Sequence, residues 1–290
     1  MDIERFGMDT ITLAGPLEAK LRAVREGGFT QIMLSARDIV GHPDGEDAAI
    51  DAVKHSGLRV TGFQVLRDFE GLAGDLHEYK VDIAKSMLTM CHALGSRVLL
   101  CCSTTSAHAE DSRDRFVADL QKLAMLAVPF RIDIAFEALS WGRFVNNVTD
   151  AWELVERADR HNLGLAIDSY HMLATGTPVT ALEDVDPGKI LFVQLADFMW
   201  QSTPTADERR ETARHFRVFP REGVHSAEIG ALVRQLDDLG YAGDYSFEVF
   251  NDDYLQMPLA TVTARARRSV QWLMNQVPQR SLPFRRHRAA

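Results

Sequence analysis

Strand-like and helix-like stretches alternate eight times along the sequence, and this alternation limits the fold more than any other feature. The strand-like stretches are short and apolar, and they cover residues 5–13, 29–35, 58–67, 97–102, 133–137, 164–168, 190–197 and 244–250. The main helix-like stretches mostly end near a glycine or a proline, and they cover residues 16–28, 46–56, 76–94, 111–127, 149–161, 227–239 and 258–274. Strands that alternate with helices over short connections predict a parallel sheet, and eight repeats predict a closed (β/α)8 barrel.

The composition narrows the class of protein. With 290 residues and 46% apolar side chains, the chain can form one barrel of ordinary size, so we expect a single catalytic domain over residues 1–275. The net charge of −9 argues against nucleic acid as a partner, because phosphate binding usually needs a basic surplus. No apolar run approaches the roughly 20 residues of a membrane span, and the start MDIERFGMD has no signal-peptide core. Three cysteines offer no disulfide framework, so we expect a cytoplasmic protein without a membrane partner.

Two segments do not follow the alternation. Residues 200–224 form a long, charged stretch that we expect to be irregular. Residues 276–290 form a basic tail, which we expect to be a mobile end; a contact with anions, or with a partner subunit in a homo-oligomer, is the alternative left open. The basic residues of the tail are Arg280, Arg285, Arg286 and Arg288.

The stretches at residues 133–137 and 164–168 share one pattern of side chains. Alternation along a strand puts the bulky residues on one face and leaves the other face with small residues and a final carboxylate, Glu137 or Asp168. In a parallel barrel the bulky face meets the helices and the small face meets the crowded axis. Both carboxylates are therefore expected at the carboxyl ends of the strands, where such barrels keep their chemistry.

The last two strand-like stretches repeat this pattern, with Gln194 and Glu248 on the inward face near their ends. Three carboxylates buried together repel one another, so they must protonate, pair or bind a cation. A divalent ion among these side chains would satisfy them together, and oxygen ligands favour Mg²⁺, Mn²⁺ or Co²⁺ ahead of zinc. The alternative is that an arginine or a backbone amide caps each residue separately.

These strand ends resemble the metal-binding strand ends of the xylose-isomerase-like barrel superfamily, which includes sugar isomerases, epimerases and endonuclease IV-type repair enzymes; the segments are FEALSW, AIDSYH, FVQLAD and SFEVFND. A larger set resembles, more narrowly, the metal-dependent 3-dehydroshikimate dehydratases: FQVLRDFEG, AFEALSWG, DSYH, QLAD, RHFRVFP and FEVFND. Glutamine in QLAD, where many superfamily members have histidine, is similar to the dehydratase branch. The resemblance extends to about Leu273 and implies that the metal ligands are Glu137, Asp168, Gln194 and Glu248.

His171 lies three residues beyond Asp168, so its side chain is expected over the barrel mouth. A lone histidine is more often packed or solvated than catalytic. Beside a metal cluster it becomes a good general-base candidate, because its ordinary pKa is near neutral. The resemblance supports this role, and we expect the catalytic residues to be His171 and the ligand Glu137.

Several cationic residues are candidates for substrate binding. Arg67 ends the third strand-like stretch and could hold a substrate carboxylate through a guanidinium fork, although pairing with a neighbouring carboxylate is the plain alternative. Arg217, in RHFRVFP, matches a second substrate-side arginine of the dehydratases, and Arg214 and His215 lie beside it. Ordinary surface charge is the alternative for all three.

The segment before and after Arg217 departs from the dehydratase pattern. Ala213 stands where the family usually has a serine, and Arg221 gives FPREG where the family usually has FPGEG. These changes affect the substrate-side loop and leave the metal site intact.

The resemblance implies a metal-dependent hydro-lyase that converts 3-dehydroshikimate, a substrate with a carboxylate and a ring ketone, to protocatechuate by an enolate-type elimination of water. A sugar or polyol isomerase or epimerase is the first alternative, and it would need two acid/base groups on opposite faces of its substrate. An endonuclease IV-like repair enzyme is the second, and it would need more metal ligands, including histidines, and a basic surface.

Overall fold

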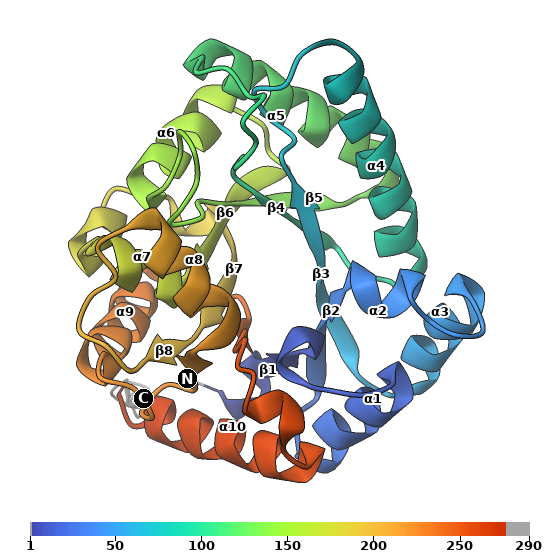
Figure 1. Ribbon diagram of the computed structural model, residues 1–290, viewed down its shortest axis with the longest axis vertical. Helices are drawn as coiled ribbons and strands as arrows, with labels where there is room; N and C mark the ends of the chain where they lie inside the picture. Colours follow the sequence, from blue (N-terminus) through green and yellow to red (C-terminus); the bar gives the residue numbers. More distant parts are fainter. Residues whose placement is uncertain (1, 277–290) are drawn as a thin grey trace, which may run out of the picture.

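Eight parallel strands close into a barrel in the computed structural model, which describes residues 2–276 (Figure 1). Around the barrel their order is β1-β10-β7-β6-β5-β4-β3-β2. The strands are β1 (Phe6–Asp9), β2 (Gln31–Ser35), β3 (Arg59–Arg67), β4 (Val98–Cys102), β5 (Asp133–Glu137), β6 (Leu163–Asp168), β7 (Ile190–Leu195) and β10 (Tyr245–Phe247). The predicted (β/α)8 barrel is confirmed.

Helices surround the barrel, and most of them cover the outer faces of the strands (Figure 1). They are α1 (Leu17–Glu26), α2 (Ala36–Val40), α3 (Glu46–His55), α4 (Gly74–Ala93), α5 (Arg113–Ala127), α6 (Val148–Ala158), α7 (Ser169–Thr175), α8 (Ala206–His215), α9 (Ser226–Leu239) and α10 (Leu259–Met274). None of these helices is both long enough and apolar enough to cross a lipid bilayer. The basic tail lies outside the described residues apart from its first residue, Gln276.

The two faces of the strands pack as the alternation predicts. Ile134 and Phe136 of β5 belong to the large core between the barrel and the helices. Ala135 of β5 and Ala166 of β6 belong instead to a small separate cluster inside the barrel, together with Phe192 of β7. Small residues on the inward face leave room at the axis, so the polar residues that end these strands can converge there.

The prediction of an irregular segment over residues 200–224 is wrong in part, because α8 lies within it. Thr205 begins the helix with a capping box: its side chain accepts the N–H of Glu208, and the Glu208 carboxylate accepts the N–H of Thr205. Only Thr212 and Ala213 of α8 are buried, so the helix has almost no apolar stripe for sequence reasoning to detect.

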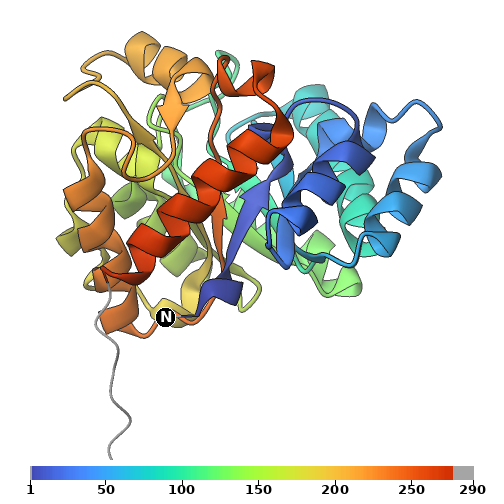
Figure 2. The ribbon, with the colours of Figure 1, turned by 90° about the horizontal axis from the view of Figure 1, so that it is seen from below.

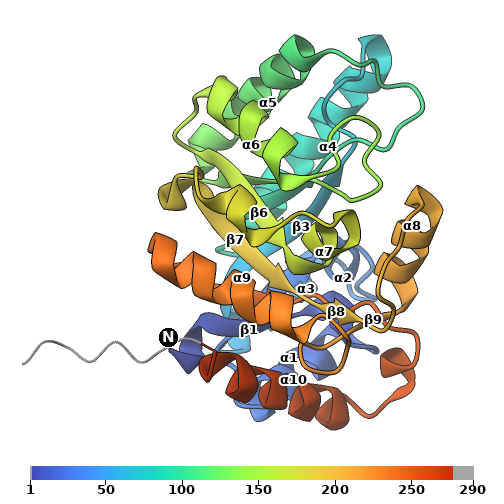
Figure 3. The same ribbon diagram turned by 90° about the vertical axis from the view of Figure 1, so that its left-hand side faces the viewer.

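A short two-stranded sheet anchors this segment to the barrel. Strand β8 (Asp197–Phe198) pairs antiparallel with β9 (Arg217–Val218). Figures 2 and 3 show α8 at the end of the barrel opposite the N-terminus, which is the end toward which the strand arrows point. The segment therefore lies at the mouth formed by the carboxyl ends of the strands.

Candidate active site

Three neighbouring strands and the residue after β10 bring the four expected ligands together. Asp168 pairs in register with Gln194, and Gln194 pairs with Ser246, two residues before Glu248. Glu137, Asp168, Gln194 and Glu248 are all at least nine-tenths buried. The carboxyl ends of β5, β6, β7 and β10 thus deliver three carboxylates and one amide to the same part of the barrel.

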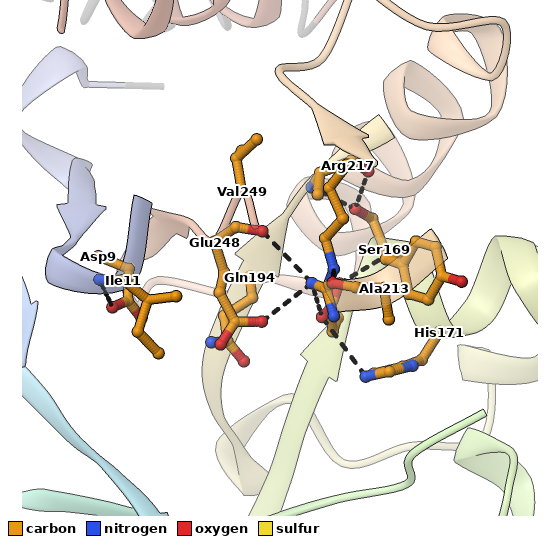
Figure 4. Close-up of polar contacts among 12 residues, drawn as sticks. Asp9, Ile11, Ser169, His171, Gln194, Ala213, Arg217, Glu248 and Val249 are labelled. Atoms are coloured by element: carbon orange, nitrogen blue, oxygen red, sulfur yellow. Dashed lines mark hydrogen bonds and ion pairs between the residues drawn. The ribbon is translucent and has the colours of Figure 1, made fainter. Parts of the chain in front are cut away.

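Arg217 lies among these carboxylates (Figure 4). Its Nη1 donates to Asp168 Oδ2 at 2.7 Å and to Glu248 Oε2 at 2.9 Å. Its Nε donates to the carbonyl of Ala213, and its guanidinium lies 4.5 Å from the ring centre of Tyr170. Burial alone would lower the pKa of Arg217, but the two carboxylates raise it above its ordinary value, so the guanidinium stays charged. A substrate role for Arg217 stays a prediction; here the residue neutralises two of the expected ligands.

Glu137 has two oxygens in different surroundings. Oε2 accepts the thiol hydrogen of Cys102 at 2.8 Å, whereas Oε1 is buried without a hydrogen-bond partner among the described residues. Burial raises the pKa of Glu137 to about 8, with further contributions from Asp168 and Glu248. Burial likewise raises the pKa of Glu248. The ionised carboxylates are therefore held in an environment that disfavours their charge.

Side-chain oxygens without partners indicate that the cluster fits a cation. Gln194 Oε1 is buried and, like Glu137 Oε1, has no hydrogen-bond partner among residues 2–276. Burying one such oxygen without a hydrogen bond costs about 1–3 kcal/mol of folding free energy, because the oxygen loses its contacts with water. Ligand atoms of Glu137, Asp168 and His171 lie within 4.8 Å of one another. Carboxylate, amide and imidazole donors in this arrangement fit a divalent metal ion.

His171 lies beside the carboxylates, as expected, and its ring is oriented by Ser140. Nε2 lies 3.7 Å from Asp168 Oδ2 and 4.0 Å from Glu137 Oε1. Nδ1 lies 3.2 Å from the backbone nitrogen of Ser140 and 3.1 Å from its Oγ. Burial and then Arg217 lower the pKa of His171 well below its ordinary value, so the ring is neutral at pH 7. Nε2 is thus the ring nitrogen that faces the site, and it can serve either as a metal donor or as a base, but not as both.

A cavity of about 420 Å³ opens above this cluster. Its lining includes Glu137, His171 and Glu248 from the polar cluster and Trp141, whose ring meets the His171 ring edge to face at 5.2 Å. The full lining is Ile11, Gln64, Val65, Arg67, Cys102, Glu137, Leu139, Trp141, His171, Ala213, Arg214, Arg217, Glu248 and Phe250.

Arg67 and Arg214 both line this cavity from exposed positions, and neither forms an ion pair with a carboxylate of residues 2–276, although the charge of Glu211 acts on Arg214 and that of Glu248 on Arg67. Desolvation and then the charge of Arg67 lower the pKa of Arg214, so the two guanidinium groups are close enough to repel each other. The carboxylate next to Arg67, that of Asp68, accepts the backbone N–H of Thr105. His215 does not join them, because it pairs with Asp252 at 3.0 Å and does not line the cavity.

Sequence reasoning missed three polar residues beside the cluster, namely Asp9, Gln64 and Cys102. Asp9 ends β1 fully buried, and Gln64 Nε2 donates to its Oδ2. Burial, followed by the charge of Glu248, raises the pKa of Asp9 well above its ordinary value. Residues 7–9 repeat the pattern of a small residue and then a carboxylate on one face, and this signal could have identified Asp9.

A closed parallel barrel with buried carboxylates at the carboxyl ends of its strands is the arrangement of a barrel enzyme. The chain belongs to the family described as xylose isomerase-like TIM barrel, whose model matches residues 21–276.

Two relatives in this family are 3-dehydroshikimate dehydratases. The one from Pseudomonas aeruginosa is 34% identical over 91% of this chain and 41% of its own length, and the one from Pseudomonas putida is 32% identical over 92% and 41%. An inosose isomerase from Bacillus licheniformis is 26% identical over 71% of this chain and 70% of its own length.

The chain is also similar to a solved structure, a xylose isomerase-like TIM barrel/4-hydroxyphenylpyruvate dioxygenase fusion protein, with a TM-score of 0.86 and 32% identity over 94% of this chain and 43% of that one. The chain thus spans about two fifths of the length of the two dehydratases and of the fusion protein.

Proposed function

We propose that this chain is a divalent-metal-dependent dehydratase that converts 3-dehydroshikimate to protocatechuate. The similarity to two dehydratases over nine-tenths of the chain supports the reaction class. The pair of cations at the cavity supports the substrate class, and it is the observation on which the proposal mainly rests.

Arg67 and Arg214 favour a substrate that carries a carboxylate. Two guanidinium groups that line one cavity, and that form no ion pair with the described residues, can both bind the same anion. An acidic ring ketone such as 3-dehydroshikimate supplies that charge, whereas a neutral sugar or polyol does not. The cavity therefore favours the dehydratase over an isomerase of neutral substrates.

The metal would be held by Glu137, Asp168, Gln194 and Glu248, with His171 beside them. When bound, a divalent ion supplies Lewis acidity to a carbonyl oxygen and so acidifies the neighbouring C–H bond. The orphaned oxygens of Glu137 and Gln194 support this assignment. With Nε2 of His171 kept as the base, this ligand set contains only oxygens, which favours Mg²⁺, Mn²⁺ or Co²⁺ ahead of zinc.

His171 is the proposed general base, and Ser140 contacts its Nδ1, which leaves Nε2 as the ring nitrogen that faces the carboxylates. With the ring hydrogen on Nδ1, donated to Ser140 Oγ, Nε2 is free to take the proton beside the ketone. The backbone N–H of Ser140 points at the same Nδ1 and favours the opposite tautomer, with the hydrogen on Nε2. The backbone contact thus opposes the base role, and His171 acts as the base through Nε2 only when the ring hydrogen is on Nδ1 and is donated to Ser140 Oγ.

The reaction balances as the loss of one water. The base takes the proton next to the ketone, hydroxide leaves from the adjacent carbon, and enolisation of the remaining ketone completes the aromatic ring. Aromatisation makes the reverse reaction negligible.

An isomerase acting on a polyol-derived ketone is the second candidate, and the similarity to the inosose isomerase supports it. A substrate panel separates the two proposals. The purified chain with Mn²⁺ should turn over 3-dehydroshikimate and should not turn over inosose. The methyl ester of 3-dehydroshikimate lacks the charge, so its kcat/KM should be about 10- to 100-fold lower. Turnover of inosose alone would replace the proposal with the isomerase.

Two expectations about partners stay predictions: that the chain binds no nucleic acid, and that it forms a homo-oligomer.

A further inference from the structure

Cys102 lies at the end of β4 directly beside Glu137 at the end of β5, because the two residues are paired in the parallel register. The Sγ of Cys102 lies 2.8 Å from Glu137 Oε2. Cys102 is only 3% exposed, and it lines the same cavity as Glu137. The thiol therefore contacts an expected metal ligand from within the site.

This contact makes the two oxygens of Glu137 unequal. In the ionised form that a metal ligand takes, the Glu137 carboxylate can only accept hydrogen bonds, so the hydrogen in the contact then belongs to the thiol, which donates to Oε2. Oε1 is left without a partner among the described residues and lies on the side of His171 Nε2, at 4.0 Å. One oxygen is thus fixed by the protein while the other points, unsatisfied, toward the ligand atoms of its neighbours.

We propose that Cys102 is a positioning residue for the metal site: its thiol holds Oε2 of Glu137 so that Oε1 is presented to the ion. The inference rests on the proposed function, since it assumes that Glu137 is a ligand. A hydrogen bond to a ligating carboxylate fixes its orientation before the ion arrives, and losing such a partner typically weakens metal binding about 10- to 100-fold.

Cys101 provides the matched control. It precedes Cys102 on the same strand, and the alternation of the strand turns it to the other face, into the core between barrel and helices. It is fully buried and, unlike Cys102, does not line the cavity. A Cys101→Val variant therefore repeats the loss of a buried thiol without touching Glu137.

The experiment measures Mn²⁺ binding to the metal-stripped full chain, with free Mn²⁺ read from its electron paramagnetic resonance signal. Cys102→Val keeps the volume of the side chain and removes the donor, and we expect it to weaken binding about 10-fold. Cys102→Ser keeps a donor, and we expect it to restore binding to within about threefold of the wild type, because a hydroxyl also donates to a carboxylate. Cys101→Val should bind as the wild type does. Circular dichroism confirms that each variant is folded.

Two results would overturn the inference while leaving the proposed function standing: wild-type affinity in Cys102→Val, or a Cys102→Ser variant as weak as Cys102→Val. A weakening of equal size in Cys101→Val would also overturn it, because the effect would then come from packing. A wild-type chain that binds no Mn²⁺ would contradict the proposed metal site, and the inference would fall with it.

Discussion

Among single residues, the proposed catalysis depends most on His171. Its Nε2 lies within 4.0 Å of both Glu137 and Asp168, so its side chain can reach a substrate held at the same ligands. We expect His171→Asn to retain metal binding and to lower kcat by roughly 10²- to 10⁴-fold, the usual weight of general-base catalysis. Steady-state kinetics on 3-dehydroshikimate tests this. The exposed His161 serves as control, and a His171→Asn enzyme with the turnover of His161→Asn would move the base elsewhere.

Arg67 and Arg214 should act on substrate affinity. A charge-assisted hydrogen bond contributes about 1.5–3 kcal/mol, so replacing either arginine with methionine should lower kcat/KM about 10- to 100-fold. The loss should disappear with the methyl ester of the substrate, because no charge is left to bind. Arg157→Met offers a control, since Arg157 pairs with Asp114 at the surface and does not line the cavity. Equal kinetics in all three variants would reduce Arg67 and Arg214 to surface charges.

Arg217 should matter for stability as well as for binding. Removing it leaves Asp168 and Glu248 buried with neither of these ion pairs, and breaking a buried pair typically costs about 3–5 kcal/mol. We therefore expect Arg217→Met to unfold at markedly lower urea concentration when stripped of metal, and Mn²⁺ to recover more stability in the variant than in the wild type. The more exposed pair of Arg157 and Asp114 gives the control. A metal-free Arg217→Met variant as stable as Arg157→Met would show that the ion pairs contribute little.

At the scale of elements, the connection between β3 and α4 contains a buried carboxyl group away from the site. Glu70 is fully buried, and one of its oxygens has no hydrogen-bond partner among the described residues. Burial raises the pKa of Glu70 to about 8. The folded protein therefore holds this proton more tightly than the unfolded chain, and Glu70 makes the folded protein less stable as the pH rises from the unfolded pKa of 4.5 toward 8.

Glu70→Gln should remove this pH dependence, because the amide cannot ionise. We expect the variant to gain stability relative to the wild type on going from pH 5 to pH 8, by an amount on the order of a few kcal/mol. Urea unfolding at the two pH values measures the change. A stability difference between variant and wild type that is the same at both pH values would contradict the assignment.

The elements also show where sequence reasoning succeeds and where it fails. Strand β5 is predicted at its observed bounds, because its alternation and its final carboxylate are both local signals. Strand β1 ends at Asp9, several residues before the predicted end, because the Asp9 side chain accepts the N–H of Ile11 and begins a short 3-10 helix. Helix α8 is not predicted from the sequence, because its surface is almost entirely polar and it shows no apolar stripe. Its capping box is the one local signal of a helix start in this segment.

At the scale of the whole molecule, the barrel brings together residues that the sequence can only place at strand ends. The convergence of Glu137, Asp168, Gln194 and Glu248 is predictable, because all parallel strands of a barrel end on one side. The ion pairs of Arg217 are not, since they join a residue of the short strand β9 to Asp168 and Glu248, which lie 49 and 31 residues away in the chain. Contacts of this kind depend on the path of the chain between the strands, and no local pattern in the sequence predicts that path.

If the chain dehydrates 3-dehydroshikimate with a divalent metal, removing and restoring the metal should stop and restart the formation of protocatechuate. Protein stripped with a chelator and dialysed should show no ultraviolet absorbance of protocatechuate with 3-dehydroshikimate. Mg²⁺, Mn²⁺, Co²⁺ and Zn²⁺ are then added back in parallel, and we expect at least one of them to restore product formation. Glu137→Gln, which lacks one ligand charge, should stay inactive at the same metal concentration. Full product formation by the metal-stripped protein, or none with any of the four ions, would contradict the account.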